Sequence, residues 1–159
     1  MIGNRLGPAI VAGVVLVVLA IYPQFSHAAT DLVLNPSLDY TSDSNDGPLI
    51  TGERLSDGSL SKGTPAYIIF YHRECYNSKR QARRTVDLYE KYKGKVNFII
   101  VDLDTGLSKE QDALKSRFYR NYIPHVTVID GNGSVLYDRS GEVGTDKISA
   151  ILDGALKNS

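Results

Sequence analysis

The chain of 159 residues is 42% apolar and 23% charged, which is ordinary for a globular protein. Its 18 Lys and Arg residues balance 18 Asp and Glu residues, so the charge gives no reason to expect nucleic acid or a polyanionic substrate as a partner. Cys75 is the only cysteine, which excludes an internal disulfide. This residue is therefore a buried inert thiol, a reactive thiol or one half of an intermolecular disulfide, such as that of a disulfide-linked dimer.

The N-terminal residues have the pattern of a targeting segment. Arg5 precedes the apolar run Leu6–Tyr22, and Ser26 and Ala28 form the small-x-small pattern that a signal peptidase reads. We therefore predict a signal peptide over residues 1–28, cleaved after Ala28. The alternative is an uncleaved membrane anchor, because the 17 residues of Leu6–Tyr22 lie at the lower end of the spanning range. Both alternatives make the rest of the chain extracytoplasmic, either periplasmic or secreted.

Residues 29–48 are predicted to be a linker, and residues 49–159 the folded domain. The stretch Asp31–Gly47 is rich in Ser, Asp, Asn and Pro and has no apolar period, which is typical of a linker. The next stretch, Leu49–Gly63, has scattered apolar residues and two turn signals. These features indicate an extra strand or hairpin against the domain, with no assigned place in the fold.

Strand and helix signals alternate along the rest of the chain. Continuous β-branched and aromatic runs indicate buried strands, a stripe of apolar residues or an N-terminal cap indicates helices, and the turn Gly131–Gly133 indicates a hairpin. Ser108 and Gln111 form a capping box, and Thr145 caps the last helix. The predicted strands are Ala66–Tyr71, Asn97–Leu103, Val126–Asp130 and Ser134–Asp138, and the predicted helices are Cys75–Tyr92, Ser108–Tyr119 and one that begins at Thr145. Strands joined through helices must run parallel, so this order predicts a mixed α/β sheet with helices on both faces.

Three local features together resemble the thioredoxin-like family, over about Leu60 to Leu156. An aromatic-rich strand runs into His72-Arg73-Glu74-Cys75-Tyr76-Asn77-Ser78-Lys79 and then a helix, as at the strand-to-helix corner of thioredoxins. Ile123-Pro124 opens a strand where thioredoxins have a cis Ile-Pro bond, and Gly141 follows the hairpin at the place of a family glycine. The resemblance implies a three-layer α/β sandwich with a mixed central sheet of four to five strands.

The resemblance also implies the site residues and shows where this chain departs from the pattern. Cys75 would be the catalytic cysteine, with Ser78 in place of the second one, giving a Cys-x-x-Ser motif. The residues expected to line a groove for a bound peptide are Tyr76, Asn77, Ile123 and Pro124. Thioredoxins also carry a buried aspartate and a lysine that serve release of the substrate disulfide; here Ile69 and Ile100 take their places, and Glu74 replaces the usual Trp.

Cys75 is expected to favour the thiolate, because it would lie at the N-terminus of a helix. Arg73, Lys79 and Arg80 would add positive charge, Ser78 would donate a hydrogen bond to the sulfur, and Glu74 would oppose these effects. Such a thiolate attacks a disulfide, but Ser78 cannot resolve the adduct, so no complete dithiol cycle is expected. Monothiol disulfide exchange, mixed-disulfide capture of partners or thiol oxidation sensing remain, with proteins or low-molecular-weight thiols and disulfides as partners.

Two alternatives to the hypothesis of monothiol chemistry remain open. The first is a redox-inactive thioredoxin-fold module that binds protein partners. The second, minor alternative is copper or zinc bound by His72, Cys75 and His125, since two histidines and a cysteine suit these metals. No other cofactor is expected. The basic cluster Lys79, Arg80, Arg83 and Arg84 is expected to be a solvated face, with attraction of acidic partners or glutathione carboxylates as its functional alternative.

Overall fold

The computed structural model describes Gly3 and residues 31–157 of the chain. The predicted targeting segment and its cleavage site therefore lie outside the described residues, apart from Gly3. Within the described part, no helix is long and apolar enough to cross a membrane.

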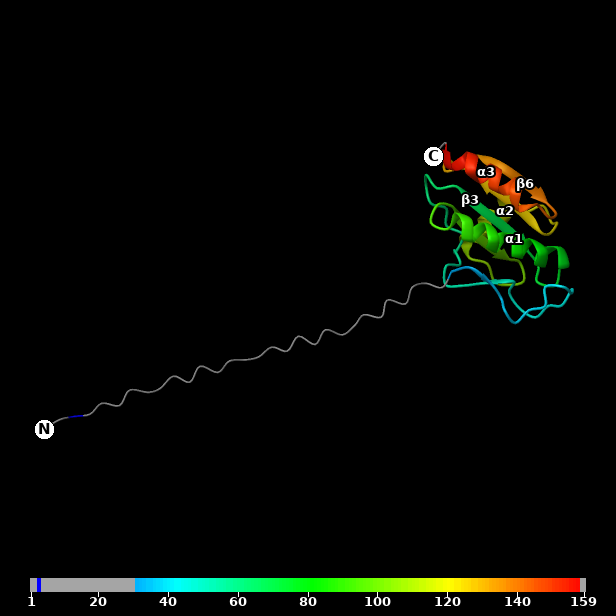
Figure 1. Ribbon diagram of the computed structural model, residues 1–159, viewed down its shortest axis with the longest axis horizontal. Helices are drawn as coiled ribbons and strands as arrows, with labels where there is room; N and C mark the ends of the chain where they lie inside the picture. The colour runs from blue at the N-terminus through cyan, green and yellow to red at the C-terminus, as the bar shows by residue number, and fades with distance from the viewer. Residues whose placement is uncertain (1–2, 4–30, 158–159) are drawn as a thin grey trace.

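A four-stranded mixed sheet in the order β4-β3-β5-β6 forms the centre of the molecule (Figure 1). β3 (Ala66–Tyr71) pairs in parallel with β4 (Asn97–Asp102) and antiparallel with β5 (His125–Ile129). β5 in turn pairs antiparallel with β6 (Val135–Ser140). The predicted order of strands and helices is confirmed, and so is the mixed α/β sheet.

Helices cover both faces of this sheet, which gives the three layers of the fold. The side chains of β3 are all buried and alternate between the faces, as a central strand requires. Tyr67, Ile69 and Tyr71 pack in the core beneath α1 (Tyr76–Tyr92) and α3 (Thr145–Lys157). Three other β3 side chains lie in a second core beneath α2 (Lys109–Phe118), namely Ala66, Ile68 and Phe70.

The ends of the helices follow the local signals in the sequence. α1 has Cys75 as its N-cap and ends before Gly94, whose φ of 78° lies in the left-handed region. The capping box at the start of α2 is confirmed: the Ser108 side chain accepts from the Gln111 amide, and the Gln111 side chain accepts from the Ser108 amide. These caps set the direction in which each helix leaves the sheet.

The stretch predicted to be a linker is instead part of the folded unit. The extra strand expected in Leu49–Gly63 is β2 (Ile50–Thr51), and it pairs antiparallel with β1 (Val33–Leu34) of this stretch. The two strands form a small sheet separate from the central one. Leu32 and Tyr40 are buried in the core beneath α1.

Polar residues in this stretch stabilise turns, which explains why its composition wrongly indicated a linker. The Tyr40 hydroxyl accepts from the Asn35 amide at 3.0 Å and donates to the Leu49 carbonyl. The Asp39 side chain accepts from the amide and the hydroxyl of Thr41. Ser, Asp and Asn are favoured in linkers, but the same side chains satisfy the backbone of ordered turns. A few buried apolar residues are then enough to attach the stretch to the domain.

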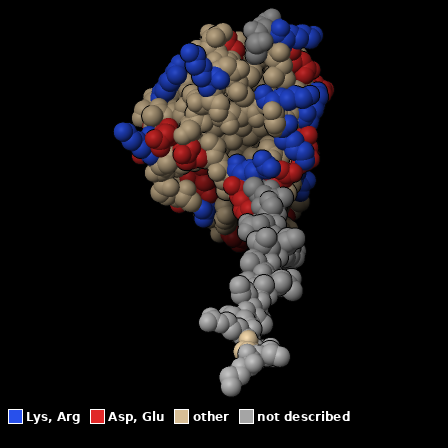
Figure 2. Space-filling model, turned by 90° about the vertical axis from the view of Figure 1, so that its left-hand side faces the viewer, with Lys and Arg blue, Asp and Glu red and all other residues tan. Residues whose placement is uncertain are grey.

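Charges of both signs are interspersed at the surface. On the face shown in Figure 2, Lys and Arg residues alternate with Asp and Glu residues around an area formed by other residues. This distribution matches the equal number of basic and acidic residues in the chain.

Candidate functional site

The sheet topology brings three loops to one end of the molecule. Phe70 near the end of β3 lies opposite His125 at the start of β5, and His125 lies opposite Ser140 at the end of β6. The loops that carry Cys75, the Ile123-Pro124 bond and Gly141 therefore meet at this end of the sheet. The Gly141 amide donates to the Pro124 carbonyl at 2.7 Å, which joins two of these loops directly.

Cys75 is a free, half-buried thiol at the N-cap of α1. Its backbone is extended, and its carbonyl accepts the first intrahelical bond, from the Lys79 amide at 3.0 Å. The side chain makes no capping hydrogen bond. An N-cap side chain is normally aimed at the free amides of the first turn, so a thiolate here would face the positive end of a 17-residue helix.

Ser78 lies where the sequence places it, but it does not act as predicted. The residue is fully buried, and its hydroxyl oxygen has no hydrogen-bond partner among the described residues. The expected hydrogen bond from Ser78 to the sulfur of Cys75 is therefore absent. The serine occupies the position of a second cysteine without bonding to the first.

The Ile123-Pro124 peptide bond is cis, as the resemblance implied. Pro124 is buried, while Tyr122 is 68% exposed at the same loop. In the first turn of α1, Tyr76 is also exposed, and the Asn77 side chain accepts from Arg80 at 2.9 Å. The expected groove residues thus come from the first turn of α1 and from the loop before β5, at one end of the sheet, and Tyr122 is exposed next to them.

The cations expected to activate Cys75 are all engaged elsewhere. Arg73 Nε donates to the Asp102 carboxylate at 2.8 Å, at the end of β4. Arg80 and Arg84 both pair with Glu142, Arg84 at 2.7 Å, and Arg83 lies over the Tyr40 ring. The predicted solvated basic face is confirmed for Arg80 and Arg83, which are exposed, although each also contacts a neighbouring segment of the fold.

Lys79 departs furthest from the prediction, since it is only 1% exposed. Its ammonium donates to the Asp39 carbonyl at 2.8 Å and to the Ser44 hydroxyl at 3.0 Å. Between these two anchors, the Asp43 carboxylate accepts a hydrogen bond from the Tyr76 amide at 2.7 Å. We call residues 39–44 the strap; it lies against the first turn of α1, beside Cys75. Sequence patterns gave no sign of this contact, because its partners are more than thirty residues apart.

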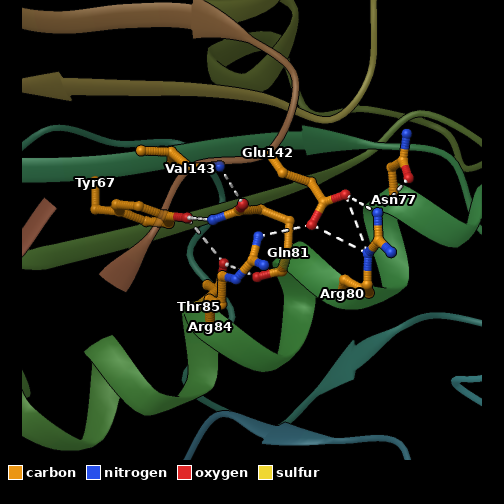
Figure 3. A network of polar contacts seen from close by, with 8 residues as sticks. All are labelled: Tyr67, Asn77, Arg80, Gln81, Arg84, Thr85, Glu142 and Val143. Atoms are coloured by element: carbon orange, nitrogen blue, oxygen red, sulfur yellow. Dashed lines mark hydrogen bonds and ion pairs between the residues drawn. The ribbon is translucent and has the colours of Figure 1, made fainter. Parts of the chain in front are cut away.

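A buried polar network fixes α1 to the loop between β6 and α3 (Figure 3). The Gln81 side chain accepts from the Val143 amide at 2.9 Å and donates to the Tyr67 hydroxyl at 3.3 Å. Tyr67 also lies 2.9 Å from the Thr85 hydroxyl, and burial raises the pKa of Tyr67 to about 12. Tyr67 therefore stays neutral and serves as a structural hydrogen-bonding group.

Glu142 extends this network to the surface (Figure 3). Burial alone would raise the pKa of Glu142, but the hydrogen bonds and charges of Arg80 and Arg84 outweigh it and hold the pKa below its usual 4.5. One carboxylate thus holds two turns of α1 against the loop that follows β6.

The proposed metal ligands do not come together. Both ring nitrogens of His125 are engaged within the sheet, with Ser140 at 2.9 Å and Asp138 at 2.7 Å. His72 instead pairs with Asp104 at 2.7 Å. Across residues 31–157, no group of three His, Cys, Asp or Glu side chains is arranged to hold a metal ion. The copper or zinc alternative is therefore wrong for His72, Cys75 and His125.

The two positions at which the resemblance implied buried charges are apolar. Ile69 on β3 and Ile100 on β4 are register partners, 0% and 4% exposed, in the core beneath α1. No titratable side chain can relay a proton from these two positions.

Comparison with known proteins identifies the fold. No family model and no curated protein sequence matches the chain. Among solved structures, an uncharacterized thioredoxin-like protein from Clostridium perfringens is 20% identical with a TM-score of 0.50, over 60% of this chain and 73% of that one. Thioredoxin-2, a component of the malaria parasite protein secretion machinery, is 18% identical with a TM-score of 0.51, over 61% of this chain and 88% of that one. At these identities the likeness shows the fold: the chain has a thioredoxin-like α/β fold.

Proposed function

We propose that this chain is an extracytoplasmic thioredoxin-fold protein that captures partners through a mixed disulfide on Cys75. The observation that carries the proposal is the position of Cys75. It is a free, half-buried cysteine at the N-cap of α1, at the end of the sheet that also holds the cis Ile123-Pro124 bond. The N-terminal sequence pattern supports a periplasmic or secreted location, with cleavage or anchoring as its two forms.

The chemistry is one thiol–disulfide exchange. The Cys75 thiolate attacks one sulfur of a partner disulfide, forms a new bond to that sulfur and releases the other sulfur as a thiolate. The cysteine is oxidised, the released sulfur is reduced, and the proton lost from Cys75 goes to solvent or to the leaving thiolate. A serine hydroxyl cannot displace sulfur, so Ser78 leaves the adduct in place until an external thiol attacks it.

The residues that would release the bound partner in a second step are replaced at three positions. Ser78 replaces the resolving cysteine, and Ile69 with Ile100 replaces the charged pair that would serve its release step. These three positions support retention of a partner over rapid turnover. Low-molecular-weight thiols would complete the exchange when they are present.

The test is trapping in the native compartment. The chain is purified from its extracytoplasmic compartment without reductant, after excess alkylating agent has blocked free thiols, and the groups attached to Cys75 are identified by mass spectrometry. We expect covalent adducts that dithiothreitol releases and that Cys75→Ser lacks. The proposal fails if Cys75 is recovered as a free thiol that reacts only after unfolding.

A redox-inactive binding module is the second candidate, and the pairing of the cations favours it. Arg73 and Arg80, which would support a thiolate, are bound to Asp102 and Glu142 instead. Such a module would keep its partners in Cys75→Ser and lose them in Tyr122→Ala, which removes the most exposed aromatic ring beside Pro124. Mixed-disulfide capture predicts instead that Cys75→Ser loses the partners and that Tyr122→Ala has the smaller effect.

A further inference from the structure

The strap, residues 39–44, is anchored on the helix turn that carries Cys75. Lys79 is the anchoring residue. It is buried, and its ammonium donates both hydrogen bonds to the strap, one to the Asp39 carbonyl and one to the Ser44 hydroxyl. A buried ammonium is costly unless acceptors surround it. The anchor therefore favours one position of the strap on α1.

This position sets the Asp43 carboxylate beside the start of α1. Its oxygen lies 2.7 Å from the amide nitrogen of Tyr76, the first residue of the helix and the one that follows Cys75. The carboxylate thus occupies the first free amide of the helix. It also brings a negative charge to the end where the Cys75 thiolate would form.

Three of the cations near Cys75, namely Arg73, Arg80 and Arg84, are paired with carboxylates other than Asp43, whereas Lys79 and Arg83 contact neutral groups. Glu74, which precedes Cys75, is exposed and adds a second negative charge. Each neighbouring cation or histidine from the elements packed here has its own partner within the described chain: His72 with Asp104, Arg73 with Asp102, Lys79 with the strap, Arg80 and Arg84 with Glu142, and Arg83 over Tyr40.

We propose that Asp43 is an autoinhibitory residue: while the strap is docked, its carboxylate disfavours the Cys75 thiolate and slows reaction of this thiol. The proposal deepens the proposed function and rests on it. Like charges at close range disfavour each other, and the Asp43 carboxylate is bonded to the residue next to Cys75. Because disulfide exchange and oxidation both proceed through the thiolate, this contact protects a lone thiol from unselective oxidation outside the cytoplasm.

The test compares Asp43→Asn with Asp46→Asn in the chain with Cys75 intact. The first change removes the charge at the Tyr76 amide and keeps an oxygen that can accept its hydrogen bond. The second is a matched control: Asp46 is exposed, lies in the same stretch and carries the same charge. The measurement is the rate of iodoacetamide alkylation of the folded chain, followed by intact mass across about pH 5 to pH 9.

We expect Asp43→Asn to alkylate about threefold faster or more near pH 7, with its rate profile displaced to lower pH. Asp46→Asn should match the unchanged chain. Asp43→Ala, which also frees the Tyr76 amide, should react at least as fast as Asp43→Asn.

Three outcomes separate this proposal from the proposed function. Equal rates in the unchanged chain, Asp43→Asn and Asp46→Asn would overturn the inhibition and leave mixed-disulfide capture standing. A folded chain that is inert until Asp43 is replaced would support the inhibition in its strongest form. If Cys75 stays inert in every folded variant and reacts only in urea, both proposals are overturned.

Discussion

The sheet interior beneath α1 and the first turn of α1 differ in their content of charged side chains. In the interior, Ile69 and Ile100 face each other across β3 and β4, and both are buried and apolar. At the first turn, charged groups are dense, and Arg80 and Lys79 are bound to other segments of the chain. The positions at which the resemblance to thioredoxins implied buried charges are therefore apolar in this fold. Charge at this end of the molecule holds loops together.

Placing a charge in the interior should have the largest effect on stability. Ile69→Asp introduces a carboxylate at a fully buried position whose register partner, Ile100, offers no hydrogen bond. We expect the free energy of unfolding to fall by about 3–5 kcal/mol, or folding to fail, because an unpaired buried charge is strongly destabilising. Urea unfolding followed by circular dichroism measures it.

Ile69→Val is the control for this change, since it removes one methylene without adding charge. It should cost about 1 kcal/mol. An Ile69→Asp chain as stable as Ile69→Val would show that the interior tolerates charge, and the contrast between the two regions would be wrong.

Disrupting the buried network at α1 should cause the second-largest loss of stability. Gln81→Leu keeps the approximate volume but leaves the buried Val143 amide without its acceptor at 2.9 Å. We expect a loss of about 2 kcal/mol, the usual result of an unsatisfied buried donor. Asp87→Leu is a matched change on the exposed face of the same helix and should stay within about 0.5 kcal/mol of the unchanged chain. Similar losses in both variants would mean that the network carries little of the stability.

The Glu142 pairs at the surface should contribute least, in a way that depends on pH. The folded-state pKa of Glu142 lies below its usual 4.5, so its stabilisation is present above that pH and is lost as the pH falls through the folded pKa. Glu142→Gln should therefore cost about 1 kcal/mol near pH 7. The difference from the unchanged chain should shrink as the pH falls below about 4.5.

Urea unfolding of both chains at several pH values measures this difference. The other carboxylates titrate alike in the two chains, so their contributions cancel. A difference that stays constant down to about pH 3 would contradict the assignment of the low pKa to Glu142.

Much of the fold could be predicted because its signals are local. The six-residue run Ala66–Tyr71 has apolar and aromatic side chains throughout, as a strand covered on both faces requires. Ser108 and Gln111 form their capping box within four residues of each other. The cis bond before Pro124 followed from the resemblance. Each of these features depends on neighbours in the sequence or on a short motif.

The arrangement around Cys75 could not be predicted in the same way. Lys79 lies among four cations on a helix, and only the strap, some forty residues earlier, determines that it is buried. Likewise, the composition of residues 31–48 is typical of a linker, although Leu32 and Tyr40 attach it to the core. Periodicity finds apolar faces but does not identify distant polar partners. The sequence therefore placed Cys75 correctly at the helix start and misplaced the charges around it.

The central claim is that Cys75 attaches a partner and cannot release it unaided. The most direct measurement follows reaction of the folded, reduced chain with excess aromatic disulfide, by thiol release and intact mass. The account predicts about one released thiol per chain and a stable adduct on Cys75. Ser78→Cys should instead release about two thiols and end as an internal disulfide, and Cys75→Ser should release none. Release of both halves by the unchanged chain, without added thiol, would contradict the account.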